Sequence, residues 1–226
     1  MVETTGRWRV AAGAVLIQLC LGAIYAWSVF TPALRDAGWS KVQTQIVFAV
    51  SLATFAGVMV LAGRRLTTTG PQRLALTGGL TLGAGYIVAS VGGGTEFWAV
   101  LLGIGLIGGA GIGLAYVVPI AVGMRWYPDH KGMISGVAVA GFGFGAMAWI
   151  KIAGSWGGLI DRIGLDGTFR AYGVTFAVLV GLGSLAMVMP PKGWLPAGFT
   201  PVESIGEGGE DFSHREMLRT PQFHLI

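Results

Sequence analysis

Long apolar runs constrain this chain more than any other feature of its sequence. Each run holds about twenty residues with few charges, and short stretches rich in charge, glycine or proline separate the runs. A helix rises 1.5 Å per residue, so such a run crosses the roughly 30 Å hydrocarbon core of a bilayer. Charged residues make up 12% of the sequence, which is about half their usual share in a soluble domain. The runs therefore predict an integral membrane protein.

The number of runs predicts an all-α membrane protein in which residues 1–190 form a six-transmembrane-helix bundle. The expected spans are 10–34, 42–62, 74–92, 97–124, 133–158 and 170–189. Ser40 is a candidate N-cap for the second span. The first run follows Arg7 and Arg9 as a signal peptide would, but it is longer than a typical signal sequence and comparable runs follow it. We therefore expect a retained first helix.

The composition changes after the sixth run. From Pro190 and Pro191 onward the chain is rich in proline, glycine and acidic residues, which is typical of a solvated linker. From Met217 it turns apolar again, as the start of a seventh helix would. We expect residues 191–226 to be a cytoplasmic linker and the start of a seventh helix, and we expect a complementary carboxy-terminal half as partner.

The segments that connect the spans lie on two sides of the membrane, and one side carries more basic residues. The richer side holds both termini and the following residues: Arg7, Arg9, Arg64, Arg65, Arg73, Arg125, Lys131, Lys192, Arg215 and Arg219. Because cytoplasmic loops carry an excess of lysine and arginine, we expect a multi-pass protein of the cell (inner) membrane with both termini cytoplasmic. The basic residues are dispersed and form no cluster, so the expected surrounding is the lipid bilayer and no nucleic acid.

Residues with catalytic or metal-binding chemistry are sparse. The histidines, His130, His214 and His224, and the single Cys20 show no metal-ligand spacing. Gly103-Ile-Gly-Leu-Ile-Gly108 matches a nucleotide-binding pattern but lies inside an apolar run, where helix contact is the better explanation. We expect no enzyme, no metal and no cofactor. A six-helix membrane module that assembles with a partner without transporting is the alternative to a transporter.

Polar side chains within the first span indicate a binding surface. Gln18, Gly22 and Tyr25 stand at i, i+4 and i+7, which places them on one helical face. Amides and phenols at lipid depth cost free energy unless they meet a partner, water or a ligand. Gln18 and Tyr25 are therefore predicted to face a substrate, with a packed tyrosine and an interhelical hydrogen bond as the alternative. Trp27 lies nearer the outer end and is expected to be an interfacial anchor.

The fourth span repeats this arrangement. Tyr116 shares a helical face with Gly109 and Gly113, and it too is predicted to contact substrate. Pro119 removes a backbone donor and allows the helix to bend.

Further residues are predicted to serve helix packing or gating. Gly141 and Gly145 repeat the four-residue spacing of Gly109 and Gly113, which is typical of helix-contact grooves. Asp129 and Lys131, beside His130, are expected to form a charged loop that contacts neighbouring helix ends at a gate.

Three segments together resemble a known family. They are Gly22-Ala-Ile-Tyr-Ala-Trp-Ser-Val-Phe30, Gly113-Leu-Ala-Tyr-Val-Val-Pro119, and Arg125-Trp-Tyr-Pro-Asp-His-Lys-Gly132 with the glycine-rich run at 135–145. In this combination the chain is similar to the amino-terminal half of the oxalate/formate antiporter family, a branch of the major facilitator superfamily that also resembles monocarboxylate carriers. One departure is Gly63-Arg-Arg-Leu-Thr-Thr-Thr-Gly70, where threonines replace the aspartate and arginine usual in that superfamily.

The resemblance implies a fold of two six-helix halves with the substrate between them near the midplane. It implies a small carboxylate substrate, such as oxalate, formate or lactate, moved by alternating access. It also implies that the arginine and lysine that neutralise the carboxylates belong to the second half. No acidic residue or histidine lies deep within these spans, which favours either exchange or a proton site in the second half.

Overall fold

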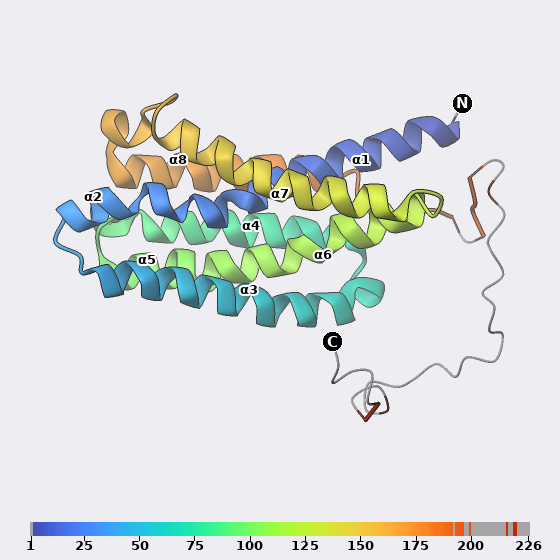
Figure 1. Ribbon diagram of the computed structural model, residues 1–226, viewed down its shortest axis with the longest axis horizontal. Coiled ribbons are helices and arrows are strands. Elements are labelled where there is room, and N and C mark those ends of the chain that lie inside the picture. Colours follow the sequence, from blue (N-terminus) through green and yellow to red (C-terminus); the bar gives the residue numbers. More distant parts are fainter. Residues whose placement is uncertain (1, 192, 197–198, 200–215, 217–218, 221–226) are drawn as a thin grey trace. The chain divides into compact units, whose positions relative to one another are not determined.

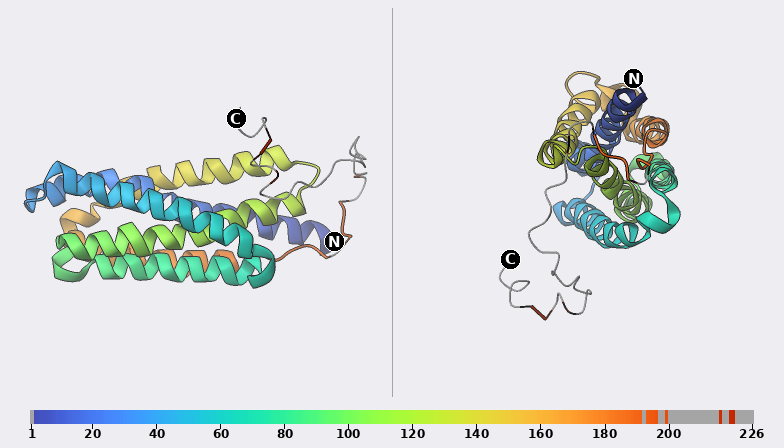
Figure 2. Two further views of the ribbon diagram at one scale, coloured as in Figure 1. Left: turned by 90° about the horizontal axis from the view of Figure 1, so that it is seen from below. Right: turned by 90° about the vertical axis from the view of Figure 1, so that its right-hand side faces the viewer.

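The computed structural model describes residues 2–191, 193–196, 199, 216, 219 and 220. Up to Pro196 these residues form one unit, a bundle of long helices that run side by side (Figure 1), and the bundle is seen end-on in Figure 2. The part of the chain that is described contains no strand. The helical segments in chain order are α1 (Val2–Leu21), η1 (Gly22–Val29), α2 (Thr31–Asp36), α3 (Lys41–Thr69), α4 (Pro71–Ala89), η2 (Val91–Gly94), α5 (Phe97–Val100), η3 (Leu101–Gly108), α6 (Gly109–Trp126), α7 (Lys131–Ala153) and α8 (Leu159–Ser184).

The all-helical membrane fold is confirmed, and the number of long helices agrees with the prediction approximately. Five of the described helices are long and apolar enough to cross a membrane, whereas the sequence predicts six. The remaining long helix, α4, packs within the bundle against α6 and α8. It has 19 residues, begins with Pro71, Gln72 and Arg73, and contains several glycines. These residues lower the mean hydropathy of α4.

Several expected helix ends also differ from the structure. The run at 10–34 is divided into α1, the 3-10 helix η1 and the short α2. The run at 42–62 extends to Thr69, because Gly70, with φ of 85°, ends α3 in a conformation that favours glycine. The run at 170–189 falls in α8, which begins at Leu159, is kinked at Gly164 with φ of 71°, and ends at Ser184. Most of the predicted linker and seventh-helix start lies outside the described residues.

The start of α3 follows the prediction made from Ser40. The Gln43 backbone N–H donates to Ser40 Oγ at 3.2 Å, and the Ser40 backbone N–H donates to Gln43 Oε1 at 2.8 Å. This capping box satisfies donors that the first turn of a helix leaves unpaired. It fixes where α3 begins, next to the end of α2.

A buried aromatic cluster joins α4, α7 and α8 to Phe30, the residue that follows η1. Tyr172 and Phe176 of α8 pack against Trp149 of α7, with ring centroids 5.1 and 4.8 Å apart. Phe30 packs on Tyr172 at 5.9 Å, and the Tyr172 hydroxyl donates to the carbonyl of Trp149. Large aromatic side chains bury much apolar area and favour such edge-on contacts. The cluster therefore fixes the position of η1 against α7.

Glycines bring helix backbones into direct contact elsewhere in the bundle. A Cβ at Gly103 of η3 would overlap the carbonyl oxygen of Gly85 and lie 2.6 Å from the backbone nitrogen of Ala89 in α4. A Cβ at Gly83 would lie 2.6 Å from the carbonyl oxygen of Gly173 in α8. Gly103 opens the segment that matches the nucleotide-binding pattern, and its place is a helix contact.

Candidate functional site

Two of the predicted substrate-facing residues come together around one phenylalanine. Tyr25 of η1 and Tyr116 of α6 both pack edge-on against Phe142 of α7, with ring centroids 5.5 and 5.2 Å away. Phe55 of α3 completes this group, with its ring 5.2 Å from that of Tyr116. Tyr116 is half-buried and Tyr25 is 47% exposed. Four helical segments thus supply an aromatic wall that carries two phenol groups.

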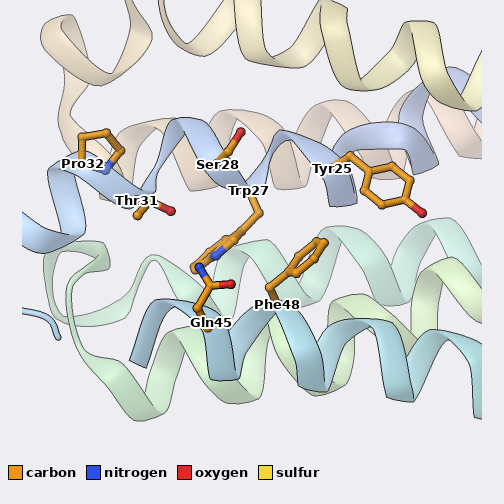
Figure 3. Close-up of a pocket in the computed structure, with 7 residues that line it drawn as sticks. All are labelled: Tyr25, Trp27, Ser28, Thr31, Pro32, Gln45 and Phe48. Atoms are coloured by element: carbon orange, nitrogen blue, oxygen red, sulfur yellow. The ribbon is translucent and has the colours of Figure 1, made fainter. Parts of the chain in front are cut away.

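The 3-10 geometry of η1 extends this wall toward the outer end of the bundle. A 3-10 helix has three residues per turn, so Ser28 follows Tyr25 along one side of η1, and Thr31 is the first residue of the next helix, α2. All three line a cavity of about 370 Å³ between η1 and α3 (Figure 3). Gln45 and Phe48 of α3 line its opposite side. The cavity combines hydroxyl and amide groups with aromatic rings.

The structure encloses Gln18, unlike Tyr25. Its side chain is fully buried between α1 and α7, where a Cβ at Gly141 would lie 3.3 Å from Gln18 Cβ. Neither amide atom of Gln18 has a hydrogen-bond partner among the described residues. Gln18 does not line the cavity of Figure 3. Gln18, Gly22 and Tyr25 therefore do not form one open face, because Gln18 is buried and Tyr25 is exposed.

The expectation for Trp27 is wrong. Trp27 is 6% exposed, and its indole N–H donates to the Thr44 carbonyl of α3 at 3.0 Å. It joins η1 to α3 instead of anchoring the protein at the membrane surface. The site also includes residues that were not predicted from the sequence: Ser28, Gln45, Phe48, Phe55 and Phe142. The three-residue spacing of Tyr25, Ser28 and Thr31 was the available signal, although it is visible only if the segment is assumed to be a 3-10 helix.

The predicted packing residues lie where helices meet. A Cβ at Gly22 would overlap the Phe142 carbonyl oxygen of α7 and lie 3.0 Å from the Ala146 nitrogen. A Cβ at Gly145 would overlap the Leu19 carbonyl oxygen of α1. The backbone of α7 therefore lies directly on α1 and η1.

On the other side of the site, α6 lies against α3. A Cβ at Gly109 would lie 2.7 Å from the Ser51 carbonyl oxygen, and one at Gly113 would lie 2.8 Å from that of Phe55. Pro119 is buried within α6. These close contacts set the distance between the helices that carry Tyr116 and Phe55.

A charged cluster lies at the opposite end of α1 from η1. Arg7 forms an ion pair with Asp129 in the loop between α6 and α7, and its guanidinium lies 4.2 Å from the centre of the Tyr127 ring. His130 Nδ1 lies 2.9 Å from the other Asp129 oxygen. The hydrogen bond from Arg7 holds the pKa of the Asp129 carboxyl below its ordinary value. Lys131 is exposed at the start of α7, and the gating role of Asp129 and Lys131 stays a prediction.

Replacing Asp129 by asparagine is expected to lower the free energy of unfolding by about 1 kcal/mol at neutral pH, because one partner of a partly exposed ion pair is lost. Because the folded-state pKa of Asp129 is lowered, its contribution is present above the ordinary carboxyl range and is lost as pH falls below about 4. Thermal unfolding in detergent should therefore show a difference between D129N and wild type that shrinks in acid. Asp161→Asn, at an exposed residue of α8, is the control. A difference that stays constant with pH would contradict this account.

Among the described residues, no three histidine, cysteine, aspartate or glutamate side chains gather where they could hold a metal ion. The site thus consists of phenols, hydroxyls, an amide and aromatic rings, set in a bundle of apolar helices. Such a bundle defines a multi-pass membrane protein.

Comparison with known proteins gives the family. Residues 10–223 match the Major Facilitator Superfamily, and the chain belongs to it. It is 26% identical over 223 residues to an uncharacterized MFS-type transporter of Escherichia coli and 27% identical over 222 residues to the oxalate:formate antiporter of Oxalobacter formigenes, each match covering 97% of this chain. It is 30% identical over 176 residues, 60% of the chain, to the apicoplast pyruvate carrier 1 of Toxoplasma gondii, of which the match covers 32%.

The chain spans about half the length of the first two relatives, 52% of the Escherichia coli protein and 50% of the Oxalobacter antiporter. The family and these relatives are transporters, so the chain belongs to a transporter family and not to an enzyme family.

Proposed function

We propose that this chain forms the amino-terminal half of a secondary transporter that moves small organic anions by alternating access. The observation that carries the proposal is the meeting of Tyr25 and Tyr116, from two different helices, around Phe142. Tyr25 is 47% exposed although it lies within a membrane-spanning segment. A phenol so placed calls for a polar partner, because an unpaired hydroxyl is costly at lipid depth.

The chemistry of the site suits a small carboxylate. Each phenol hydroxyl donates a hydrogen bond to an oxygen atom, while its ring excludes water from the other side. Ser28, Thr31 and Gln45 provide further polar groups along the neighbouring cavity. The relatives named for oxalate, formate and pyruvate act on anions of this size by their names. Oxalate, formate and lactate are therefore our candidate substrates.

A complementary half completes the proposed site. No lysine or arginine lines the cavity of Figure 3 among the described residues, yet a carboxylate taken out of water needs a positive charge nearby. We propose that cations of a second six-helix half supply it, and that the substrate lies between the halves. No group in the described part of this wall is an aspartate, glutamate or histidine, so we favour exchange of anions over proton coupling.

We further propose that both termini are cytoplasmic. Helices α1, α4 and α7 begin, and α3 and α6 end, at one end of the bundle (Figure 1). The described basic residues at that end are Arg7, Arg9, Arg64, Arg65, Arg73, Arg125 and Lys131. By the positive-inside rule this end faces the cytoplasm of a cell membrane.

The test is uptake by proteoliposomes. Labelled oxalate, formate or lactate is offered to vesicles loaded with the unlabelled anion, with this chain alone and with the chain joined to its complementary half. We expect uptake only by the complete assembly. Equal uptake by this chain alone would contradict a cation supplied by a second half. A complete assembly that moves none of the three anions, yet stabilises this chain, would favour a membrane assembly module instead.

A further inference from the structure

Two apolar grooves lie along α1 between Trp8 and Leu19. The first, of about 580 Å³, separates α1 from α7, and Met133 and Val137 form its far side. The second, of about 460 Å³, separates α1 from α8, and Leu182 and Leu185 form its far side. Both are lined by Ala12 and Leu16, so they are neighbouring channels that share a floor on α1.

Small residues of α1 near Ala12 widen these grooves. Ala12 is exposed, and Ala11 and Gly13 on either side have little or no side chain. Where α1 has larger residues it fills the space to its neighbours, as Ile17 does with no exposed surface. The grooves are therefore a property of the sequence between Ala11 and Leu16.

Each groove ends in a cation at the same end of α1. Arg9 lines the groove beside α8. The groove beside α7 leads into a smaller cavity of about 230 Å³ that contains Arg7, Asp129 and His130, and Trp8 lines both cavities. Arg7 is paired with Asp129. Arg9 is exposed, and no carboxylate of the described residues pairs with it.

The dimensions fit one leaflet of a bilayer. On α1 the groove beside α7 is lined from Trp8 to Leu19, a rise of about 16 Å at 1.5 Å per residue, and the groove beside α8 from Arg9 to Leu16, a rise of about 10 Å. Half of a hydrocarbon core is about 15 Å. Trp8 is 73% exposed beside the arginines, as tryptophan often is at the level of lipid headgroups. An extended acyl chain can therefore lie along the groove beside α7, and the first part of a second chain along the groove beside α8, while the headgroup reaches Arg9.

We propose that the paired grooves bind one anionic phospholipid, with an acyl chain in each groove and the phosphate at Arg9. Two channels that share a floor match the two chains of a single lipid. The charge of Asp129 is already balanced by Arg7, so Arg9 leaves this end of the grooves positive. Positive charge beside a membrane surface favours anionic over zwitterionic headgroups.

Native mass spectrometry of the purified chain in detergent tests the site, with phosphatidylglycerol and phosphatidylcholine of identical acyl chains as probes. We expect phosphatidylglycerol to bind more tightly. Arg9→Gln should weaken its binding about fivefold, since one basic residue near the surface contributes about 1 kcal/mol, and should leave phosphatidylcholine binding unchanged. Arg162→Gln, at an exposed residue of α8 outside the grooves, should bind both lipids as wild type does.

A second variant tests the grooves. Ala12→Trp places a large ring on the shared floor and should reduce the binding of both lipids, whereas Ala84→Trp, at an exposed alanine of α4, should not. Inorganic phosphate at millimolar concentration should fail to displace the lipid. Equal affinity for the two lipids in wild type, or equal behaviour of the Arg9 and Arg162 variants, would overturn the proposal. These readouts measure lipid binding, so they are independent of anion transport.

Discussion

A single methyl group added at Gly145 is expected to destabilise the bundle by about 3 kcal/mol, the upper part of the usual range for overpacking. In Gly145→Ala the new Cβ would overlap the Leu19 carbonyl oxygen and lie 2.8 Å from the carbonyl carbon and Cα of that residue. All three atoms belong to the backbone, so no side-chain rotation relieves the overlap. Helices α1 and α7 must move apart, and Gly22 loses its contact with Phe142 as they do.

The same helix supplies a matched control. Gly143 of α7 lies two residues from Gly145, and a Cβ there would meet no atom within 4 Å. Gly143→Ala is expected to be neutral or slightly stabilising, because alanine is the better helix former by up to about 1 kcal/mol. Thermal unfolding of both variants in detergent measures the difference. Equal midpoints for the two variants would show that α1 and α7 are not in backbone contact.

This pair also shows how far the sequence predicts the fold. Four-residue glycine spacing indicated Gly141 and Gly145 as contact positions, and the long apolar runs predicted the helical bundle. The sequence does not distinguish Gly145 from Gly143, because the distinction depends on which side of α7 meets α1. Hydropathy is a weak guide to α4 for a similar reason. This helix is less apolar than the five candidate membrane spans, and it packs against α6 and α8.

Only part of the candidate site could be predicted, because it depends on helix geometry and on the packing of separate helices. A period of 3.6 residues places Gln18, Gly22 and Tyr25 together, but the helix tightens to a 3-10 form at Gly22. Beyond this point the three-residue period joins Tyr25 to Ser28, and Thr31 at the start of α2 lines the same cavity. Residues of α3 and α7 that face Tyr25, such as Phe48 and Phe142, have no signal in their own segments. Only the packing of separate helices brings them there.

The two phenols should matter most for transport in the complete assembly. Removing one hydroxyl by Tyr25→Phe or Tyr116→Phe is expected to reduce uptake of the preferred carboxylate by tenfold or more, because a hydrogen bond to a charged group contributes about 1.5–3 kcal/mol. Both rings keep their contacts with Phe142 in these variants, so the fold should be preserved. Initial uptake rates across a range of anion concentrations separate weaker binding from slower turnover.

Tyr86→Phe is the matched control, because it removes the same hydroxyl from a tyrosine of α4 whose ring packs on Phe176 in the buried aromatic cluster. Its uptake should equal that of wild type at the same amount of folded protein. Because Tyr25 and Tyr116 flank one phenylalanine, their hydroxyls should act on one substrate, and the double variant should lose less than the product of the two single losses. If both single variants take up the anion as fast as wild type, the two hydroxyls do not contact substrate, and Tyr25 and Tyr116 are packing residues.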